Sequence, residues 1–149
     1  MNILNRRYVT NSAGETKELG ARISKLMKPG SLVFLSGGLG SGKTTFTQGF
    51  AKGLGIRQFV RSPSFVIASE YASRKAKMYH IDLYRLSPDD INRFGLEEYL
   101  YGNDICVVEW AEKFKGSVSP DIEIKFQWAG ENKRRIAVKD RRKKPATKM

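Results

Sequence analysis

Short apolar runs alternate with segments of helical periodicity along this chain. Residues 32–35 and 105–108 are continuously apolar, which is typical of strands covered on both faces in the centre of a parallel sheet. Between Ser12, which begins a capping-box pattern, and Pro29, apolar residues recur at helical spacing and predict a helix. A second helix is predicted at roughly residues 43–54, directly after a glycine-rich loop.

The remaining pattern predicts shorter elements. Apolar and polar residues alternate over residues 122–128, as in a strand with one exposed face, and a turn leads to an antiparallel partner at residues 135–138. Residues 64–71 and 77–83 are close enough to form a hairpin. Other elements are expected at residues 7–10 (strand), 87–94 (helix) and 96–101 (helix). This order predicts an α/β fold whose mixed, mainly parallel sheet has a β-hairpin edge.

Composition narrows the class of protein. A length of 149 residues, with 40% hydrophobic and 28% charged residues, fits one globular domain. A single cysteine excludes an intramolecular disulfide and a Cys-rich zinc site. The sequence contains no apolar run of membrane-spanning length, and its first residues do not resemble a secretory signal, so we expect a cytoplasmic protein without membrane contact.

The net charge of +12 is concentrated near the C-terminus. Residues 133–149 contain nine Lys and Arg against one acid, whereas residues 1–132 contain 18 basic and 14 acidic residues. We therefore expect one domain over residues 1–139 and a basic, flexible tail over residues 140–149. Such a tail either attracts RNA phosphates or serves as a solubilising extension.

The strongest motif is a complete G-x-x-x-x-G-K-[ST] sequence between the first buried strand and the helix at 43–54. Its glycines allow main-chain amides to surround a polyphosphate, and the helix start directs its dipole at the same phosphates. The lysine supplies a mobile ammonium group, and the hydroxyl that follows it is placed for Mg²⁺. The predicted nucleotide-binding residues are Gly37, Gly38, Leu39, Gly40, Ser41, Gly42, Lys43, Thr44 and Thr45.

Two acids end predicted strands near this loop. Asp82 and Glu109 are both candidates for holding Mg²⁺ directly or through water, because an α/β sheet presents its ligands at these strand ends. Pairing with a surface cation is the alternative role for either one. The sequence alone does not assign the direct metal contact.

Four further positions have open roles. The segment from Ser62 to Ser64 is either a γ-phosphate-sensing switch or a plain turn. His80, the only histidine, is more typical of a hydrogen-bonded structural residue than of a base. Cys106 is expected to be a buried small hydrophobe, and Trp110 either belongs to the core or covers a nucleotide.

Four motifs in order resemble the TsaE family, also called YjeE, over roughly residues 8–138. They are the loop with Gly-Ser-Gly-Lys-Thr-Thr-Phe, Ser-Pro-Ser-Phe at 62–65, His-Ile-Asp-Leu-Tyr-Arg-Leu at 80–86 and Val-Glu-Trp at 108–110. The resemblance implies a three-layer P-loop domain that hydrolyses ATP with Mg²⁺, weakly when alone. It also implies work with a TsaD-type transferase and its TsaB-type paralogue, which modify the adenosine next to the anticodon of tRNAs reading ANN codons.

The resemblance also implies roles for individual residues. Lys43 and Thr44 take the Walker roles, Glu109 is the Mg²⁺-linked acid together with Thr44, and Asp82 is the residue needed for hydrolysis. Ser62 and Ser64 match a switch-like Ser-Pro-Thr segment, and Trp110 matches the family's tryptophan.

This chain departs from the family pattern at two positions. Gly38 stands where the family usually has an acid, and Ser64 stands in place of threonine. The first departure bears on hydrolysis or partner affinity rather than on nucleotide binding.

Three alternative functions use the same features. The runner-up is a small-molecule or nucleotide kinase, which shares the P-loop. A regulatory GTPase is disfavoured because the chain has no Asn-Lys-x-Asp sequence. An RNA-binding protein with a structural nucleotide site would depend on the basic tail.

Overall fold

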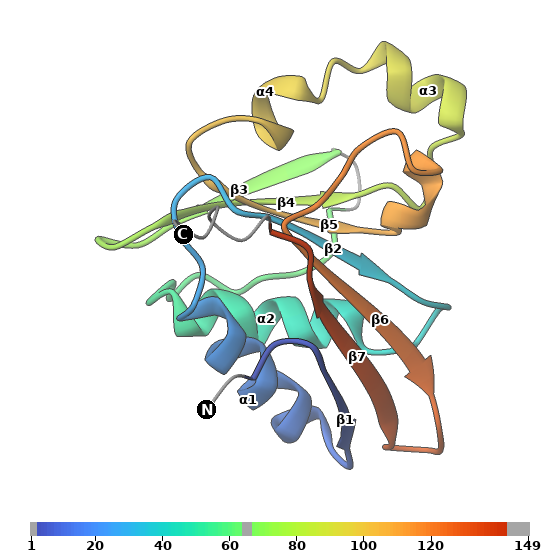
Figure 1. Cartoon of the computed structure of the whole chain (residues 1–149). Coiled ribbons are helices and arrows are strands. Elements are labelled where there is room, and N and C mark those ends of the chain that lie inside the picture. Colours follow the sequence, from blue (N-terminus) through green and yellow to red (C-terminus); the bar gives the residue numbers. More distant parts are fainter. Residues whose placement is uncertain (1–2, 64–66, 143–149) are drawn as a thin grey trace, which may run out of the picture.

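The computed structural model describes residues 3–63 and 67–142, which form one seven-stranded sheet with helices on both faces (Figure 1). The strand order is β1-β7-β6-β2-β5-β4-β3. The strands are β1 (Arg6–Thr10), β2 (Leu32–Ser36), β3 (Ala68–Ala72), β4 (Lys77–Asp82), β5 (Ile105–Glu109), β6 (Ile122–Trp128) and β7 (Arg134–Asp140). The helices are α1 (Ala13–Ser24), α2 (Lys43–Gly53), α3 (Pro88–Arg93), α4 (Glu97–Leu100) and the 3-10 helix η1 (Ala111–Phe114).

Parallel pairing is confined to the centre of the sheet. β2 pairs in parallel with β5 and β6, and β5 pairs in parallel with β4, whereas β1–β7, β6–β7 and β3–β4 are antiparallel. The predicted mixed sheet with a hairpin edge is confirmed. Its pairings are evenly divided between the two types, because each hairpin adds an antiparallel neighbour to a short parallel core.

Two hydrophobic cores separate the three layers. α1 and α2 cover one face, where Phe46 and Phe50 of α2 belong to the same larger core as Ile122 and Ile124 of β6. α3, α4 and η1 cover part of the other face above β2, β4 and β5 (Figure 1). Cys106 is buried in that second core as predicted, and burial raises the pKa of its thiol to about 12.

The contact between α1 and α2 depends on glycine. A Cβ on Gly49 would lie 2.0 Å from the carbonyl oxygen of Lys17, and one on Gly20 would lie 2.4 Å from that of Phe46. Such close backbone approach leaves no room for a side chain. α2 therefore rests directly on the backbone of α1, and this contact fixes the position of the loop that precedes α2.

Most predicted elements are present, with differences at their ends. Ser12 caps α1 through the amide of Glu15, but the Glu15 carboxylate accepts from the amide of Asn11 rather than from that of Ser12. Strand β3 begins at Ala68, and part of the segment predicted from residue 64 lies outside the described residues. α3 begins at Pro88, within the helix predicted over residues 87–94, and a capping box between Ser87 and Asp90 marks its start.

Sheet pairing extends beyond the predicted domain boundary at residue 139. Asp140 is the last residue of β7, and its carboxylate binds the guanidinium of Arg142. Arg141 donates to Glu123 of the neighbouring strand. Residues 143–149 lie outside the described part of the chain. None of the described helices has the length and apolar character that crossing a bilayer requires.

Candidate nucleotide-binding site

The glycine-rich loop connects the end of β2 to the first turn of α2. Gly37 and Gly42 have φ angles of +143° and +105°, which residues with a side chain rarely adopt. A Cβ on Gly37 would also lie 2.5 Å from the carbonyl oxygen of Phe126. The loop can therefore follow this path only with glycine at these positions.

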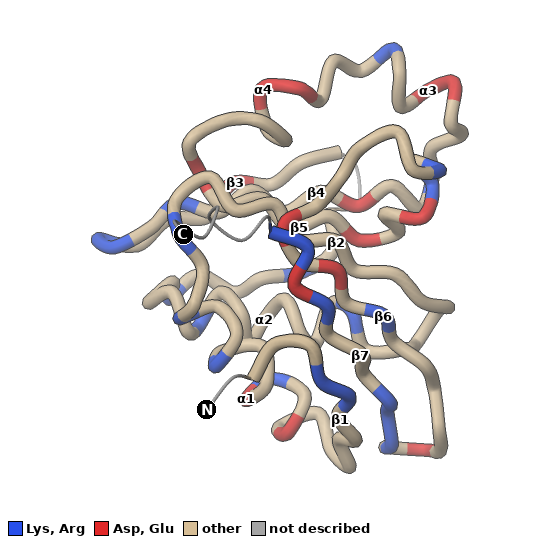
Figure 2. Tube along the Cα trace, viewed as in Figure 1, with Lys and Arg blue, Asp and Glu red and all other residues tan. Residues whose placement is uncertain are grey.

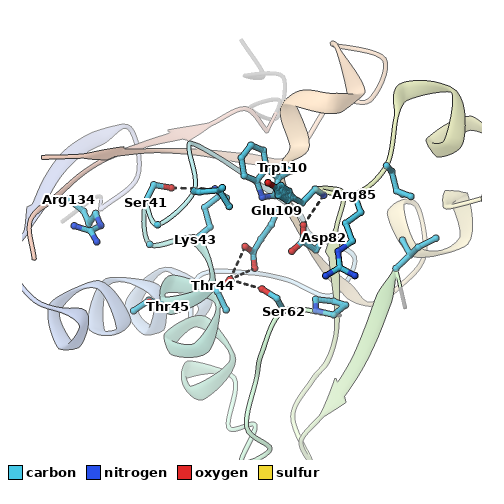
Figure 3. A pocket seen from close by; sticks show the side chains of 17 residues that line it. Ser41, Lys43, Thr44, Thr45, Ser62, Asp82, Arg85, Glu109, Trp110 and Arg134 are labelled. Carbon is cyan, nitrogen blue, oxygen red and sulfur yellow. Dashed lines mark hydrogen bonds between the residues drawn. The ribbon is translucent and has the colours of Figure 1, made fainter. Parts of the chain in front are cut away.

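A cavity of about 670 Å³ lies beside this loop (Figure 3). Its walls come from the loop, the first turn of α2, the segment before β3, the ends of β4 and β5, and the start of β7. The lining residues include Leu39, Gly40, Ser41, Gly42, Lys43, Thr44, Thr45, Ser62, Asp82, Glu109 and Trp110. Gly37 and Gly38 do not line it, but their carbonyl oxygens accept hydrogen bonds from the lysine of the motif.

Lys43 is held against the loop. Its Nζ donates to the carbonyl oxygens of Gly37 (2.5 Å) and Gly38 (2.8 Å) and lies 4.2 Å from the centre of the Trp110 ring. Burial lowers the pKa of Lys43, and the nearby carboxylates of Glu109 and others oppose that shift. A bound polyphosphate would displace these carbonyl oxygens from the Lys43 ammonium group, because neutral oxygens are weaker hydrogen-bond partners than charged phosphate oxygens.

Thr44 joins three elements at the floor of the cavity. Its Oγ1 lies 3.0 Å from Oε1 and 3.2 Å from Oε2 of Glu109, and 3.0 Å from Oγ of Ser62 (Figure 3). Glu109 is 2% exposed, and its Oε2 lies 2.5 Å from Nε2 of the fully buried His80. This hydrogen bond with His80 fixes the orientation of the Glu109 carboxylate.

Asp82 lies beside Glu109 because β4 and β5 are parallel and these two residues are Cα partners in the register. Oδ1 of Asp82 accepts from the amide of Tyr84 at 2.9 Å. Burial, with a smaller contribution from the charge of Glu109, raises the pKa of Asp82, although the Tyr84 hydrogen bond opposes the shift. The structure therefore brings both sequence-predicted acids to one end of the cavity.

The donor set fits Mg²⁺. Thr44, Glu109 and Asp82 supply one hydroxyl and two carboxylates, which are the hard oxygen ligands that this ion prefers. Among the described residues no group of three or more His, Cys, Asp or Glu side chains is arranged to hold a metal. Mg²⁺ beside a nucleotide does not need such a cage, because water and phosphate oxygens complete its shell.

Trp110 covers the lysine and also packs against the edge of the second core. It has φ +61°, and its ring stacks on Tyr84 with centroids 4.9 Å apart. Its ring lies over Lys43 and lines the cavity. Trp110 therefore contacts both the core and the cavity, and its role as a cover for a nucleotide stays a prediction.

Three residues that line the cavity or contact the loop were not predicted from the sequence. Arg85 and Arg134 both line the cavity, with Arg134 at the end away from Arg85 (Figure 3). Oε2 of Glu112 accepts from the amide of Gly37 at 3.2 Å. Arg85 lies in the motif at 80–86, which could have drawn attention to it, but Arg134 and Glu112 come from distant elements without a local signal. The predicted switch residue Ser64 lies outside the described residues.

Comparison with known proteins gives independent evidence on the family of this chain. A family model described as "Threonylcarbamoyl adenosine biosynthesis protein TsaE" matches residues 10–137. A curated Bacillus subtilis relative named tRNA threonylcarbamoyladenosine biosynthesis protein TsaE is 40% identical over 131 residues, covering 87% of this chain and 82% of the relative. The Treponema pallidum protein of that name is 37% identical, and the match covers 89% of this chain and 98% of the relative.

A solved structure is also similar. The crystal structure of Bacillus subtilis YdiB superposes with a TM-score of 0.76 at 35% identity, covering 93% of this chain and 87% of that one. The likeness supports the P-loop NTPase-like fold, and the family model matches most of the chain. The chain therefore belongs to the TsaE family.

Proposed function

We propose that this protein is a Mg²⁺-dependent ATPase whose hydrolysis of ATP serves tRNA threonylcarbamoyladenosine biosynthesis. Its family and its curated relatives are named for that process, and the chain takes part in it as a member of the family. ATP as the nucleotide, Mg²⁺ as the metal and the hydrolytic step are the parts that we propose.

One observation carries the proposal: the hydroxyl of Thr44 donates to the carboxylate of Glu109 at the floor of the cavity, directly after the glycine-rich loop. A P-loop hydroxyl and a strand-end acid are the two protein groups that hold Mg²⁺ in this class of site. The ion, when bound there, would supply positive charge that stabilises the negative charge developing on the phosphate during hydrolysis.

The residues of the chain then have separate tasks. The loop amides and Lys43 bind the phosphates, and Thr44 and Glu109 hold the metal. We assign Asp82 to orient the attacking water and accept its proton as oxygen bonds to the γ-phosphorus. The bond from that phosphorus to the β,γ-bridging oxygen breaks, so ADP leaves and inorganic phosphate forms. A pKa above the usual aspartate value suits this role, because it strengthens the base.

The resemblance to the family leads us to propose a TsaD-type transferase and a TsaB-type paralogue as partners. Nucleotide binding would set how well the protein fits this pair. Docking would then complete or reset the active complex between rounds of tRNA modification.

The test is ATP turnover and calorimetric binding of Mg-ATP, with and without the partner pair. Wild type should bind Mg-ATP and turn it over slowly alone and faster with partners. Lys43→Ala should weaken binding by about 10–100-fold, as expected for loss of a charged hydrogen bond. Glu109→Gln should raise the Mg²⁺ concentration needed for half-maximal turnover, because an amide is a weaker ligand for this ion than a carboxylate.

Two results would overturn the proposal. One is absence of binding heat with Mg-ATP and Mg-ADP on folded protein. The other is rapid transfer of phosphate to a small acceptor without the partner pair, which would instead identify a kinase.

A further inference from the structure

One side of the sheet is left without a covering helix at β1, β6 and β7. In the described part of the chain, no residue of these strands belongs to the core beneath α3, α4 and η1. The buried residues of β6 and β7 all face α1 and α2: Ile122, Ile124, Phe126, Ile136 and Val138. Because side chains alternate along a strand, the intervening residues point to the opposite face. In Figure 1 no described helix lies over that face.

This uncovered surface, which we call the open sheet face, is strongly basic. Figure 2 shows Lys and Arg positions along β1, β6 and β7. The exposed cations of the open sheet face are Arg7, Lys125, Arg135, Lys139 and Arg141. Its acid, Glu123, binds Arg141 at 2.8 Å and lies 3.4 Å from Lys125. The face therefore keeps an excess of positive charge after that acid is counted.

The register arranges these cations around a small residue. Ala137 of β7 is the Cα partner of Arg7 on one side and of Lys125 on the other. Arg135 and Lys139 lie two positions before and after it on the same strand. A shallow hollow of about 400 Å³ is lined by Ala137, by the cations Arg7, Lys125, Lys139 and Arg141, and by the acid Glu123. Cations therefore line the hollow on both sides of Ala137, and Arg135 lies outside it.

The strand geometry sets the distances between the cations around Ala137. Two strand spacings separate Arg7 from Lys125, roughly 10 Å, and four residues separate Arg135 from Lys139, roughly 13 Å. In a DNA duplex each strand places one phosphate per about 3.4 Å of helix axis, so a length of this size contains several phosphates. The floor at Ala137 leaves room for a backbone to lie between the side chains.

The composition favours a polyanion over a folded protein. A protein interface generally has a core of apolar and aromatic side chains from which charges are depleted. Here the centre is a single alanine, and the residues around it are mostly cations, with one acid, Glu123, and one exposed apolar residue, Val9. Nucleic-acid interfaces are polar and carry excess positive charge, as this face does.

We propose that the open sheet face binds the sugar–phosphate backbone of RNA. This rests on the proposed function, in which a tRNA is the molecule being modified. The contacts are to phosphates, so binding is nearly independent of sequence and weakens steeply with salt. Arg134 and Arg135 are consecutive on β7, and only Arg134 lines the nucleotide cavity, so the two ligands occupy different faces of this strand.

The test measures binding of a fluorescent, unmodified tRNA transcript to the full chain by anisotropy at 50–200 mM salt, about the range over which phosphate contacts dominate. The variant Lys125→Ala/Arg135→Ala/Lys139→Ala removes three cations from the open sheet face. Its matched control, Lys17→Ala/Arg22→Ala/Lys52→Ala, removes two Lys and one Arg from exposed positions on α1 and α2. Both variants change the net charge equally.

The first variant should raise the Kd for RNA by at least about tenfold and reduce the salt slope by about 2–3, whereas the control should change both little. Equal losses in the two variants, or stronger binding of polyglutamate than of RNA at equal charge, would overturn the proposal. So would loss of all RNA binding on deleting residues 143–149 with no effect of the face variant.

Mg-ATP binding separates this inference from the proposed function. The face variant should keep wild-type affinity for Mg-ATP and a wild-type melting temperature. A wild-type protein that binds RNA but gives no heat with Mg-ATP would refute the ATPase proposal and leave the RNA surface standing.

Discussion

Replacing Gly49 with alanine tests whether the α1–α2 contact sets the position of the nucleotide loop. A Cβ at this position would lie 2.0 Å from the carbonyl oxygen of Lys17 and 2.4 Å from its Cα. Ordinary contact begins at 3.4 Å, so the two helices would have to move apart by roughly 1.4 Å. Both atoms belong to the backbone of α1, so no side-chain rotation can relieve the clash.

Two opposing contributions determine the stability of this variant. Alanine favours the helix by up to about 1 kcal/mol over glycine. Overpacking a closely packed contact costs about 1–3 kcal/mol, and more when backbone must move. Because backbone must move, we place the cost at the upper end of this range and expect a net loss of about 2 kcal/mol in the free energy of unfolding for Gly49→Ala. Because Lys43 and Thr44 begin α2, the displacement should also raise the Kd for Mg-ATP.

Urea unfolding followed by tryptophan fluorescence measures the first effect, and calorimetry measures the second. Gly14→Ala in α1 is the matched control, because its Cβ would meet only Oγ of Ser12 at 3.7 Å. That variant should keep or gain stability, by up to about 1 kcal/mol. If Gly49→Ala is as stable as Gly14→Ala, the helices are not in the close contact that the structure shows, and the reasoning is refuted.

Three further predictions concern the site. Asp82→Asn should lower kcat by about 10²–10⁴-fold with little change in the Kd for Mg-ATP. In wild type, kcat should fall as the pH drops through the raised pKa of Asp82, because the base must be ionised. The pH profile of the variant should lack that fall. His80→Ala should lower the free energy of unfolding by about 2–4 kcal/mol in urea titrations, because it opens a cavity and removes a partner of the buried Glu109; an unchanged midpoint would contradict this. Gly38→Asp should change stability by less than about 0.5 kcal/mol, because a Cβ there meets no atom within 4 Å, and a large drop in melting temperature would show that the loop is less open than described.

Much of the fold could be predicted because its signals are local. The buried strands at 32–35 and 105–108 have continuous apolar sequences, and the N-cap residues Ser12 and Ser87 mark the starts of two helices. The register and the balance of parallel and antiparallel pairs depend on contacts between distant segments. β1, for example, pairs with β7 across more than 120 residues, and no local pattern encodes that choice.

The site likewise contains some residues that local sequence signals predict and others that only distant contacts bring together. The loop and the two acids were predictable because each stands at a strand end or helix start. The link from His80 to Glu109 was not predicted, since it joins side chains of neighbouring strands 29 residues apart. His80 was expected to be structural, and its contact shows that it positions a site residue. Arg134 was not recognised either, because only the sheet order brings β7 to the cavity.

The shared register of Asp82 and Glu109 makes their separation a property of the sheet's hydrogen bonding. A single residue inserted within β4 or β5 would turn one carboxylate to the opposite side, because side chains alternate along a strand. Residues added to the turn at 73–76 would leave both acids in place. Variation in chain length among active descendants of this sequence should therefore accumulate in that turn and spare the two strands.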